Sequence, residues 1–534
     1  MFLLHGNTRD LTPWNDGYVD IKQFLEGFLG RSKELVITFN VSQGIGFLDR
    51  GMKAKFLASV NARRALEGHG PVDALPTRAS EVLPMLEGLM QDPSQRVAII
   101  LDFVEMVVPM SDLSYMSDAD KANLVAMQRW AADPNLLASD SLVVMLTEHL
   151  SDVHRRLVGS AQLATLRVPL PDQRVREAFI GAEDLSEVET EMNPTTLAKV
   201  TAGLTLVQLR SLFRRAQQSG ETIFFSTVSR RKKEIIEREC HGLVEFVDPS
   251  HNFSHVGGLE GLKADLMRVA GAIKSGNVAR VPMGILFVGP MGTGKTYVAE
   301  AFAAESGLTC LKFKNFRERW VGSTEGNLEK ILDVVDGLGH VLLIIDEADR
   351  SMGSDSDGDG GTTSRVIARL KEFMSDTSHR GRVVMLMMTN RPDKLDADLK
   401  RPGRFDLKIP FFFPETSDIR ESILSASRKK NGIVLEEEVD LAPVATATQG
   451  YSSAELEAVL LAAVGSANDD GRTEVSQDDL GAATQDVIPS RDTRMLAYME
   501  MLAVFESSSR RMLPERFQAM DTEAVQQRLD ELKV

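Results

Sequence analysis

The stretch VPMGILFVGPMGTGKTYVAEAFAAESG, residues 281–307, decides the fold of this chain. Its first part, GILFV, is a short apolar run typical of a buried strand. Gly289-Pro290 ends the run, and Ala299, Phe302 and Ala303 then recur at helical spacing. The turn between them, GPMGTGKT, is a complete GxxxxGK[ST] pattern in the strand–loop–helix context that it requires. The sequence therefore predicts an α/β fold with a parallel sheet and a phosphate-binding loop at its edge.

The residue types in this loop suit a triphosphate. Glycines let successive backbone N–H groups point into one concavity, and the helix N-terminus adds the positive end of its dipole. A lysine can reach the β- and γ-phosphates, and a following threonine hydroxyl can ligate Mg²⁺. The predicted nucleotide-binding residues here are Gly289, Pro290, Met291, Gly292, Thr293, Gly294, Lys295 and Thr296, with Thr296 also a metal ligand.

Two further apolar runs end in polar residues. HVLLIIDEADR (340–350) ends in Asp346-Glu347. We expect Asp346 to hold magnesium through water and Glu347 to orient and polarise the attacking water. A DE pair after an apolar run is common by itself, but this pair follows a complete phosphate loop by about fifty residues. RVVMLMMTNRPDKLD (382–396) ends in Thr389-Asn390, and the Asn390 amide can hold the same water or the γ-phosphate.

Composition indicates a multidomain globular chain. It has 534 residues, 43% of them hydrophobic and 26% charged. The formal net charge of −16 disfavours binding to nucleic acid or anionic membranes. Cys240 and Cys310 form no CxxC pattern, so neither a disulfide framework nor a zinc site is predicted. No uncharged apolar run is long enough to span a membrane, and we expect a cytoplasmic protein.

The order of phosphate loop, DE strand, Asn strand and LKRPGRFDLKIP (399–410) resembles the AAA ATPases, in the branch of protein unfoldases and remodelers. The resemblance covers about residues 250–490. It implies that Arg401 and Arg404 are arginine fingers that complete a neighbouring subunit's site. It hence implies a homo-oligomeric ring, with a hexamer the expected form, that hydrolyses ATP with Mg²⁺. It also implies contacts to the nucleotide from Val256 and Gly257 in FSHVGGLEGLK, from Ile423, and from Ser453 and Ala454 in QGYSSAELEAVLLAA.

The same resemblance implies two loops that line a central pore. RERWVGSTEG (317–326) supplies Trp320, Val321 and Gly322, and an indole can wedge against an extended polypeptide. SMGSDSDGDGGTTSR (351–365) supplies Asp355, Asp357 and Asp359. Alone, the second stretch resembles half of an EF-hand, but position 12 from Asp355 is Val366 and a strand precedes it, which disfavours calcium. A solvated loop without a substrate role stays open for it.

The first half of the chain repeats the order and spacing of the apolar runs of the second half, but it has no GxxxxGK[ST] motif. ELVITF (34–39) and VSQGIGF stand where we expect the strand and the phosphate loop, with no lysine. Asp102 in RVAIILDFVE takes the place of Asp346 at a spacing of 244 residues, and Phe103 stands where the glutamate should be. Glu148 takes the place of Asn390 at 242 residues. We therefore predict a degenerate first module that does not hydrolyse ATP.

The predicted organisation is two tandem AAA modules. Its parts are a degenerate large domain (1–172), a degenerate lid (173–228), a linker (229–252), an active large domain (253–415), a helical lid (416–490) and a C-terminal helical segment (491–534).

The whole-chain pattern also resembles the hypothetical chloroplast reading frame 46 family, although Trp320 departs from the smaller residue expected there. Threading of a protein client is the first functional hypothesis. A nucleotide-dependent switch or assembly scaffold is the alternative, and a clamp-loader-type motor on nucleic acid is disfavoured by the acidic charge.

Overall fold

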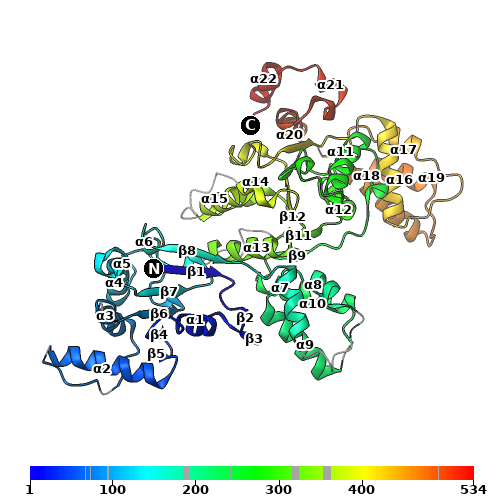
Figure 1. Cartoon of the computed structure of the whole chain (residues 1–534). Coiled ribbons are helices and arrows are strands. Elements are labelled where there is room, and N and C mark those ends of the chain that lie inside the picture. The colour runs from blue at the N-terminus through cyan, green and yellow to red at the C-terminus, as the bar shows by residue number, and fades with distance from the viewer. Residues whose placement is uncertain are drawn as a thin grey trace. The chain divides into compact units, whose positions relative to one another are not determined.

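The computed structural model describes residues 1–66, 68–72, 74–92, 95–183, 190, 192–220, 222–240, 242–314, 324–352, 362–490 and 492–533. They form two compact units (Figure 1). The first comprises Met1–Ile236 with Glu325–Gly337, and the second comprises Glu237–Thr324 with Leu338–Val534.

The first unit is built on a six-stranded sheet in the order β5-β4-β6-β7-β1-β8. Its strands are β1 (Phe2–Gly6), β4 (Leu35–Asn40), β5 (Gly44–Phe47), β6 (Val97–Asp102), β7 (Leu142–Leu146) and β8 (Ala164–Val168). All neighbours are parallel except β4 and β5, which form an antiparallel hairpin. A separate small hairpin of β2 (Leu11–Trp14) and β3 (Gly17–Asp20) follows β1.

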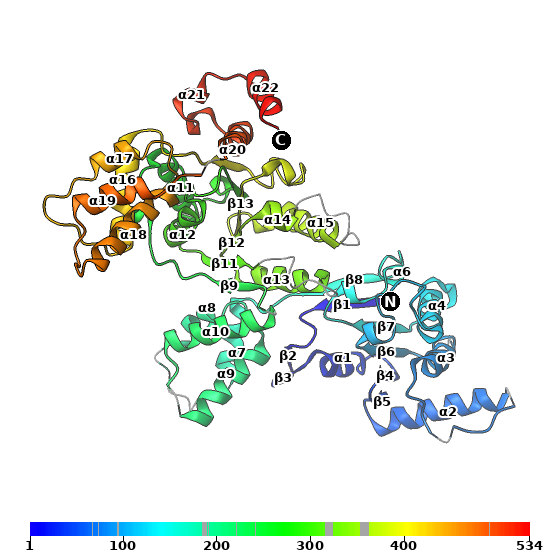
Figure 2. The ribbon, with the colours of Figure 1, turned by 180° about the vertical axis from the view of Figure 1, so that it is seen from behind.

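Helices cover both faces of this sheet (Figure 2). Along β4 and β6, alternate residues enter different cores: Val36 and Ile100 pack with α1, whereas Ile37 and Ile99 pack with helices on the other face. Burial on both faces explains why the strands are continuous apolar runs. The helices beside the sheet are α1 (Ile21–Leu29), α2 (Arg50–Leu66), α3 (Ala79–Met90), α4 (Asp118–Ala132), α5 (Pro134–Ala138) and α6 (Arg155–Val158). A separate group of helices follows β8 (Figure 1) and consists of α7 (Gln173–Ala182), α8 (Pro194–Val200), α9 (Leu206–Ser219) and α10 (Phe225–Glu239).

The second unit has its own six-stranded sheet, in the order β14-β10-β13-β12-β11-β9, and the predicted phosphate-loop strand is β10, next to the edge strand β14. The strands are β9 (Val244–Phe246), β10 (Gly284–Val288), β11 (Thr309–Phe313), β12 (Val341–Ile345), β13 (Val383–Thr389) and β14 (Leu407–Pro410). Only the edge strand β9 is antiparallel to its neighbour. Val288 pairs with Thr389 and Ile345 with Met387, so β10, β12 and β13 end at one edge.

The predicted helix after the phosphate loop is confirmed. It is α12 (Lys295–Ser306), and Ala299, Phe302 and Ala303 are buried against β10 and β12. The other helices of this part of the sequence are α11 (Glu260–Lys274), α14 (Ala348–Met352) and α15 (Thr362–Ser375). Between them in sequence lies α13 (Thr324–Leu338), most of which belongs to the first unit.

The two sheets share one topology, which confirms the prediction of tandem α/β modules. The order β8-β1-β7-β6-β4 corresponds strand for strand to β14-β10-β13-β12-β11. This correspondence corrects one expectation. The run 34–39 is the counterpart of β11, not of the phosphate-loop strand; that counterpart is β1. VSQGIGF instead turns into the antiparallel edge strand β5, with Ile37 opposite Phe47.

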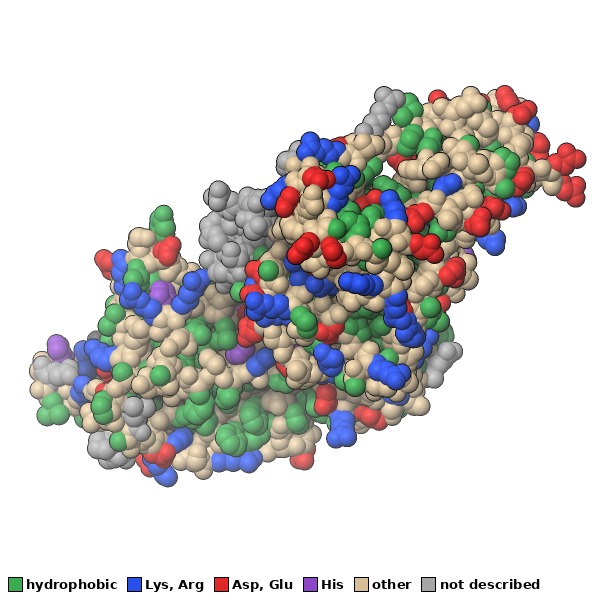
Figure 3. Space-filling model, turned by 90° about the horizontal axis from the view of Figure 1, so that it is seen from above, with side chains coloured by type: hydrophobic (Ala, Val, Ile, Leu, Met, Phe, Trp, Pro, Cys, Tyr) green, Lys and Arg blue, Asp and Glu red, His purple; other side chains and the backbone are tan. Residues whose placement is uncertain are grey.

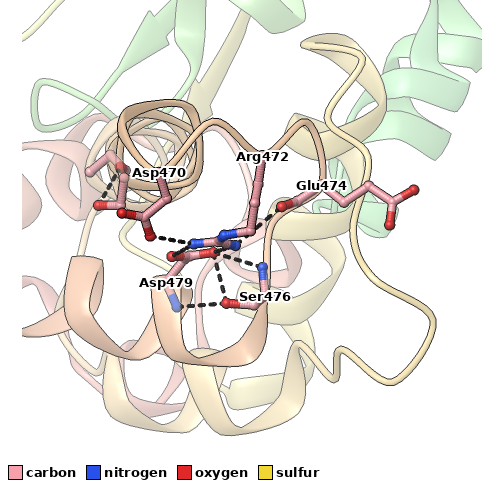
Figure 4. Close-up of polar contacts among 7 residues, drawn as sticks. Asp470, Arg472, Glu474, Ser476 and Asp479 are labelled. Carbon is pink, nitrogen blue, oxygen red and sulfur yellow. Dashed lines mark hydrogen bonds and ion pairs between the residues drawn. The ribbon is translucent and has the colours of Figure 1, made fainter.

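The lid of the second unit is a four-helix group with its own hydrophobic core. It comprises α16 (Ser417–Lys430), α17 (Ala442–Ala447), α18 (Ser453–Asp469) and α19 (Gln477–Asp486). Figure 4 shows the start of α19. Arg472 donates to both carboxylate oxygens of Asp479, at 2.6 and 2.8 Å, and to Asp470. Asp479 also closes a capping box with Ser476, so one carboxylate fixes both the helix start and the preceding turn.

A C-terminal group of helices follows the lid. It consists of α20 (Thr493–Glu506), α21 (Glu515–Gln518) and α22 (Thr522–Leu532), which share a small core with Phe412. No helix in the described ranges is both long and apolar enough to cross a membrane. On the face drawn in Figure 3, basic and acidic side chains are interspersed.

Candidate functional site

The loop between β10 and α12 has the backbone form that an anion site needs. Gly292 and Gly294 have φ values of 77° and 87°, which side-chain-bearing residues rarely adopt. A Cβ on Gly292 would lie 2.8 Å from the Ser452 hydroxyl oxygen. No described side chain caps the N-terminus of α12 at Gly294, so its first N–H groups face the loop concavity.

Lys295, the first residue of α12, reaches back to the loop with its side chain. Its Nζ donates to the carbonyl oxygens of Gly289 and Pro290, at 2.9 and 2.7 Å, and to Asn390 Oδ1 at 2.8 Å. Burial lowers the pKa of Lys295 to about 8, and the carboxylates of Asp346 and Asp349 partly oppose this shift. An anionic phosphate placed here would favour the charged amine further.

Two oxygen-bearing side chains that could bind a metal ion lie near Lys295. Thr296 is in the first turn of α12, and Asp346 directly follows β12. The Thr296 hydroxyl donates to Asp346 Oδ2 at 3.4 Å, and Lys312 Nζ lies 3.2 Å from the same oxygen. A hydroxyl and a carboxylate next to a phosphate position suit Mg²⁺, which prefers oxygen ligands and retains waters. The two residues therefore fit the predicted metal.

Glu347 follows Asp346 in a left-handed conformation, with φ 47°. Its carboxylate is half-exposed and accepts from Arg350 Nη1 at 3.0 and 3.1 Å. Such a φ value is uncommon in a residue other than glycine and marks a local backbone turn directly after β12. The position is compatible with the predicted contact to an attacking water.

A pocket of about 610 Å³ joins these groups to the lid. The predicted residues Val256, Gly257, Ile423, Ser453 and Ala454 all line it, as do Met291 to Thr296, Asp346, Glu347 and Asn390. A Cβ on Gly257 would lie 2.4 Å from the carbonyl oxygen of Ser422 in α16. A glycine at this position therefore allows α16 to pack close to the backbone of residue 257. Gly289 and Pro290 contribute through the carbonyls that accept from Lys295.

The sequence analysis missed several residues that line this pocket. Three of them are Tyr297, Lys430 and Glu457. Lys430 Nζ lies 2.8 Å from Glu457 and 4.9 Å from the centre of the Tyr297 ring, and the His251 ring stacks on Tyr297 at 3.8 Å. These residues come from α12, α16 and α18, and only the position of Tyr297 directly after GKT gave a local signal.

Arg401 and Arg404 do not line the pocket of their own chain. The Arg401 side chain is 73% exposed and pairs with Asp398 at 3.1 Å. Arg404 Nη1 donates to the Asp398 carbonyl oxygen at 2.7 Å. The predicted pore residues Trp320, Val321, Gly322, Asp355, Asp357 and Asp359 lie outside the described residues.

The same sheet edge in the first unit is filled by its own side chains. Arg9, in the loop after β1, pairs with Asp102, lies 3.7 Å from Glu148 and stacks over the Phe103 ring. Asp102 and Glu148 are the predicted counterparts of Asp346 and Asn390. Phe103 has φ 56°, close to the 47° of Glu347, so the backbone of this turn is retained while the carboxylate is lost.

A second internal contact joins this loop to helix α9. The Asp10 carboxylate, 3% exposed, accepts from the backbone N–H groups of Leu206 and Val207, both at 3.0 Å. In the second unit, the N-terminus of α18 likewise contacts the loop that follows the corresponding strand, the phosphate loop. There the Ala454 N–H group donates to the Gly292 carbonyl oxygen at 3.0 Å. An internal carboxylate thus occupies the anion-binding end of a helix in the first unit.

Comparison with known proteins gives three matches to family models. Residues 1–169 match "AAA+ chaperone, N-terminal Rossmann-like domain", and residues 174–241 match "AAA+ chaperone, second helical domain". Residues 285–413 match "ATPase family associated with various cellular activities (AAA)".

Similar curated proteins are named ATP-dependent zinc metalloprotease FtsH. The protein of Sphaerobacter thermophilus is 28% identical over 67% of this chain and 56% of its own length. That of Caldicellulosiruptor bescii is 29% identical over 68% and 60%, and that of Thermus thermophilus is 32% identical over 47% and 43%. The chain thus spans about half the length of these relatives. The sequence has no H-E-x-x-H motif, and the described residues contain no group of three or more His, Cys, Asp or Glu that could hold a metal ion.

Proposed function

We propose that this chain, which belongs to the AAA+ ATPase superfamily, binds MgATP in its second unit and hydrolyses it to ADP and phosphate. The observation that carries the proposal is the convergence of Lys295, Asp346 and Asn390 at one sheet edge beside the glycine loop. The finer resemblance to the hypothetical chloroplast reading frame 46 family stays a prediction.

The proposed roles follow from the donors and acceptors at the site. The loop amides and Lys295 hold the phosphates. Thr296 and Asp346 would hold Mg²⁺, which when bound would supply positive charge next to the phosphate oxygens. Glu347 orients and polarises a water for in-line attack on the γ-phosphorus, and Asn390 positions that phosphate. The water oxygen bonds to phosphorus, the bond to the β-phosphate oxygen breaks, and the proton of the water passes to Glu347 or to the phosphate product.

We also propose that the active form is a homo-oligomeric ring, with a hexamer the expected form. Arg401 and Arg404 lie away from the pocket of their own chain, and Arg401 is exposed. A neighbouring chain can therefore receive them. An arginine finger can be worth roughly 10³–10⁵ in rate, so an isolated chain should hydrolyse ATP slowly.

Remodelling or threading of a protein client is the work that we propose for the hydrolysis. The support is the match of residues 1–169 and 174–241 to AAA+ chaperone domains and the Trp320-Val321-Gly322 sequence. The alternative is a nucleotide-dependent switch or assembly scaffold. The first unit favours this alternative. Its own side chains occupy the sheet edge where a nucleotide would bind, so this module has a structural role instead of a catalytic one. Adding a client should raise the rate of a motor but not that of a scaffold.

Phosphate release by the purified chain tests the proposal. The wild-type chain should release phosphate only with Mg²⁺. Glu347→Gln should bind ATP without releasing phosphate, and Lys295→Met should bind ATP more weakly and release no phosphate. Proteins that co-purify with the ATP-loaded Glu347→Gln chain are candidate clients. Undiminished phosphate release by Lys295→Met would refute the assignment of the site.

A further inference from the structure

The segment 391–404 joins two groups of the proposed reaction. Asn390, whose amide accepts from Lys295, comes directly before it, and Arg401 and Arg404 lie in its last turn. Its position therefore sets one group in the chain's own site and two groups that serve a neighbour. Helix α20, which lies beyond all three matched family models, packs against this segment.

The end of α20 contacts the segment through a buried carboxylate. Glu506 is 7% exposed and pairs with Lys400 through one oxygen and with Lys408 of β14 through the other, at 3.0 Å. Lys400 Nζ also donates to the Pro392 carbonyl oxygen at 2.9 Å. Lys400 thus ties the two ends of the segment together, and it stands next to Arg401.

The middle of α20 makes a second contact, close to Asn390. Arg391 forms two hydrogen bonds to Asp393, at 3.0 and 2.8 Å, and its guanidinium lies 5.2 Å from the centre of the Tyr498 ring. The Tyr498 hydroxyl donates to Asp393 at 3.4 Å. These contacts hold the backbone directly after Asn390 at a second point.

We propose that α20, by packing on segment 391–404, positions Asn390, Arg401 and Arg404. Glu506 is its main positioning residue and acts through Lys400. The inference rests on the proposed ATPase function. Glu506 touches no reacting atom in this account. It fixes where Asn390 stands in one site and where the two arginines are presented to the next chain. A displacement of about 1 Å at such groups can cost on the order of 10²-fold in rate.

A charge-removing variant at Glu506 tests this role. Glu506→Gln keeps the side-chain shape but leaves the ammonium groups of Lys400 and Lys408 without their carboxylate. Glu523→Gln is the matched control, since Glu523 is an exposed glutamate of α22 in the same C-terminal group. For each chain, the experiment measures kcat, the ATP dissociation constant, the number of ATP bound per chain, and amide hydrogen exchange of peptides from 391–404 and from 289–298.

The expected pattern separates positioning from general destabilisation. Glu506→Gln should lower kcat by about tenfold or more, while the ATP dissociation constant and the stoichiometry stay within about twofold of wild type. Exchange should speed up in 391–404 and not in 289–298. Glu523→Gln should match wild type throughout. A merely structural role would instead reduce the bound ATP per chain in proportion to the rate.

A second variant keeps the test decisive. Because Glu506 acts through Lys400, the loss in kcat for Lys400→Met/Glu506→Gln should be smaller than the product of the two single losses. Wild-type kcat and wild-type exchange in Glu506→Gln, or losses that multiply fully, would overturn the inference alone. A wild-type chain that binds ATP but never hydrolyses it would overturn the proposed function, and the exchange data would still show whether α20 holds the segment.

Discussion

Replacing Asp10 by alanine should release helix α9 from the loop that follows β1. The Asp10 carboxylate is buried and binds the N–H groups of Leu206 and Val207, each at 3.0 Å. It also accepts from Asn7 at 2.8 Å. The next N–H group of the helix, that of Gln208, donates to the Thr205 hydroxyl. Loss of the Asp10 carboxylate would therefore leave two N–H groups, those of Leu206 and Val207, without their acceptor.

The size of the effect follows from these contacts. Hydrogen bonds to a charged group contribute about 1.5–3 kcal/mol each, and after partial hydration of the freed N–H groups we expect a net loss of about 3 kcal/mol. That loss raises the local opening constant of α9 by about two orders of magnitude.

Native-state hydrogen exchange of peptides from 206–219 measures this change. Asp20→Ala is the matched control, because Asp20 also caps a helix, α1, but accepts from Gln23 N at an exposed position. The control should leave α9 unchanged, whereas Asp10→Ala should lower its protection about a hundredfold. Protection of α9 within about threefold of wild type in Asp10→Ala would refute the reasoning.

Three further predictions concern the second unit. Lys295→Met should weaken ATP binding by about 10- to 100-fold, because it removes a charged donor worth about 1.5–3 kcal/mol; a fluorescent-nucleotide titration checks this, and unchanged affinity contradicts it. Arg404→Ala should lose activity alone but regain part of it when mixed with Lys295→Met chains, whose arginines are intact; phosphate release of the mixture measures this, and no recovery argues against action across subunits. Pairing with Arg472 holds the pKa of Asp479 well below its ordinary value, so its charged form stabilises the lid above about pH 4, and this contribution is lost as the pH falls through the native-state pKa. Asp479→Asn should therefore lower the Tm at pH 7, with a gap to wild type that narrows below about pH 4; a gap independent of pH would contradict the pairing.

Local patterns predicted the second unit well. The phosphate loop, Asp346-Glu347 and Asn390 are each read from a strand and the residues directly after it, and parallel pairing brings such ends to one edge. Tyr297, Lys430 and Glu457 come from three different helices and meet only in the folded structure. No local stretch of the sequence could therefore predict their contact.

The first unit shows where sequence reasoning went wrong and why. The strands Phe2–Gly6 and Leu35–Asn40 are both apolar runs near glycines, and nothing within either run says which lies beside β7. The place of each strand in the sheet is set by the strands that pair with it. β1 lies between β7 and β8, and β4 lies between β5 and β6. The contact of Asp10 with α9 spans 196 residues, and likewise leaves no local pattern.

Counting the nucleotides bound per chain tests the central claim most directly. Isothermal titration of Glu347→Gln with ATP and Mg²⁺ should give one site per chain, and in the double variant Lys295→Met/Glu347→Gln that site should bind ATP about 10- to 100-fold more weakly. Two sites per chain, or one site whose affinity is unchanged by the loss of Lys295, would contradict the account.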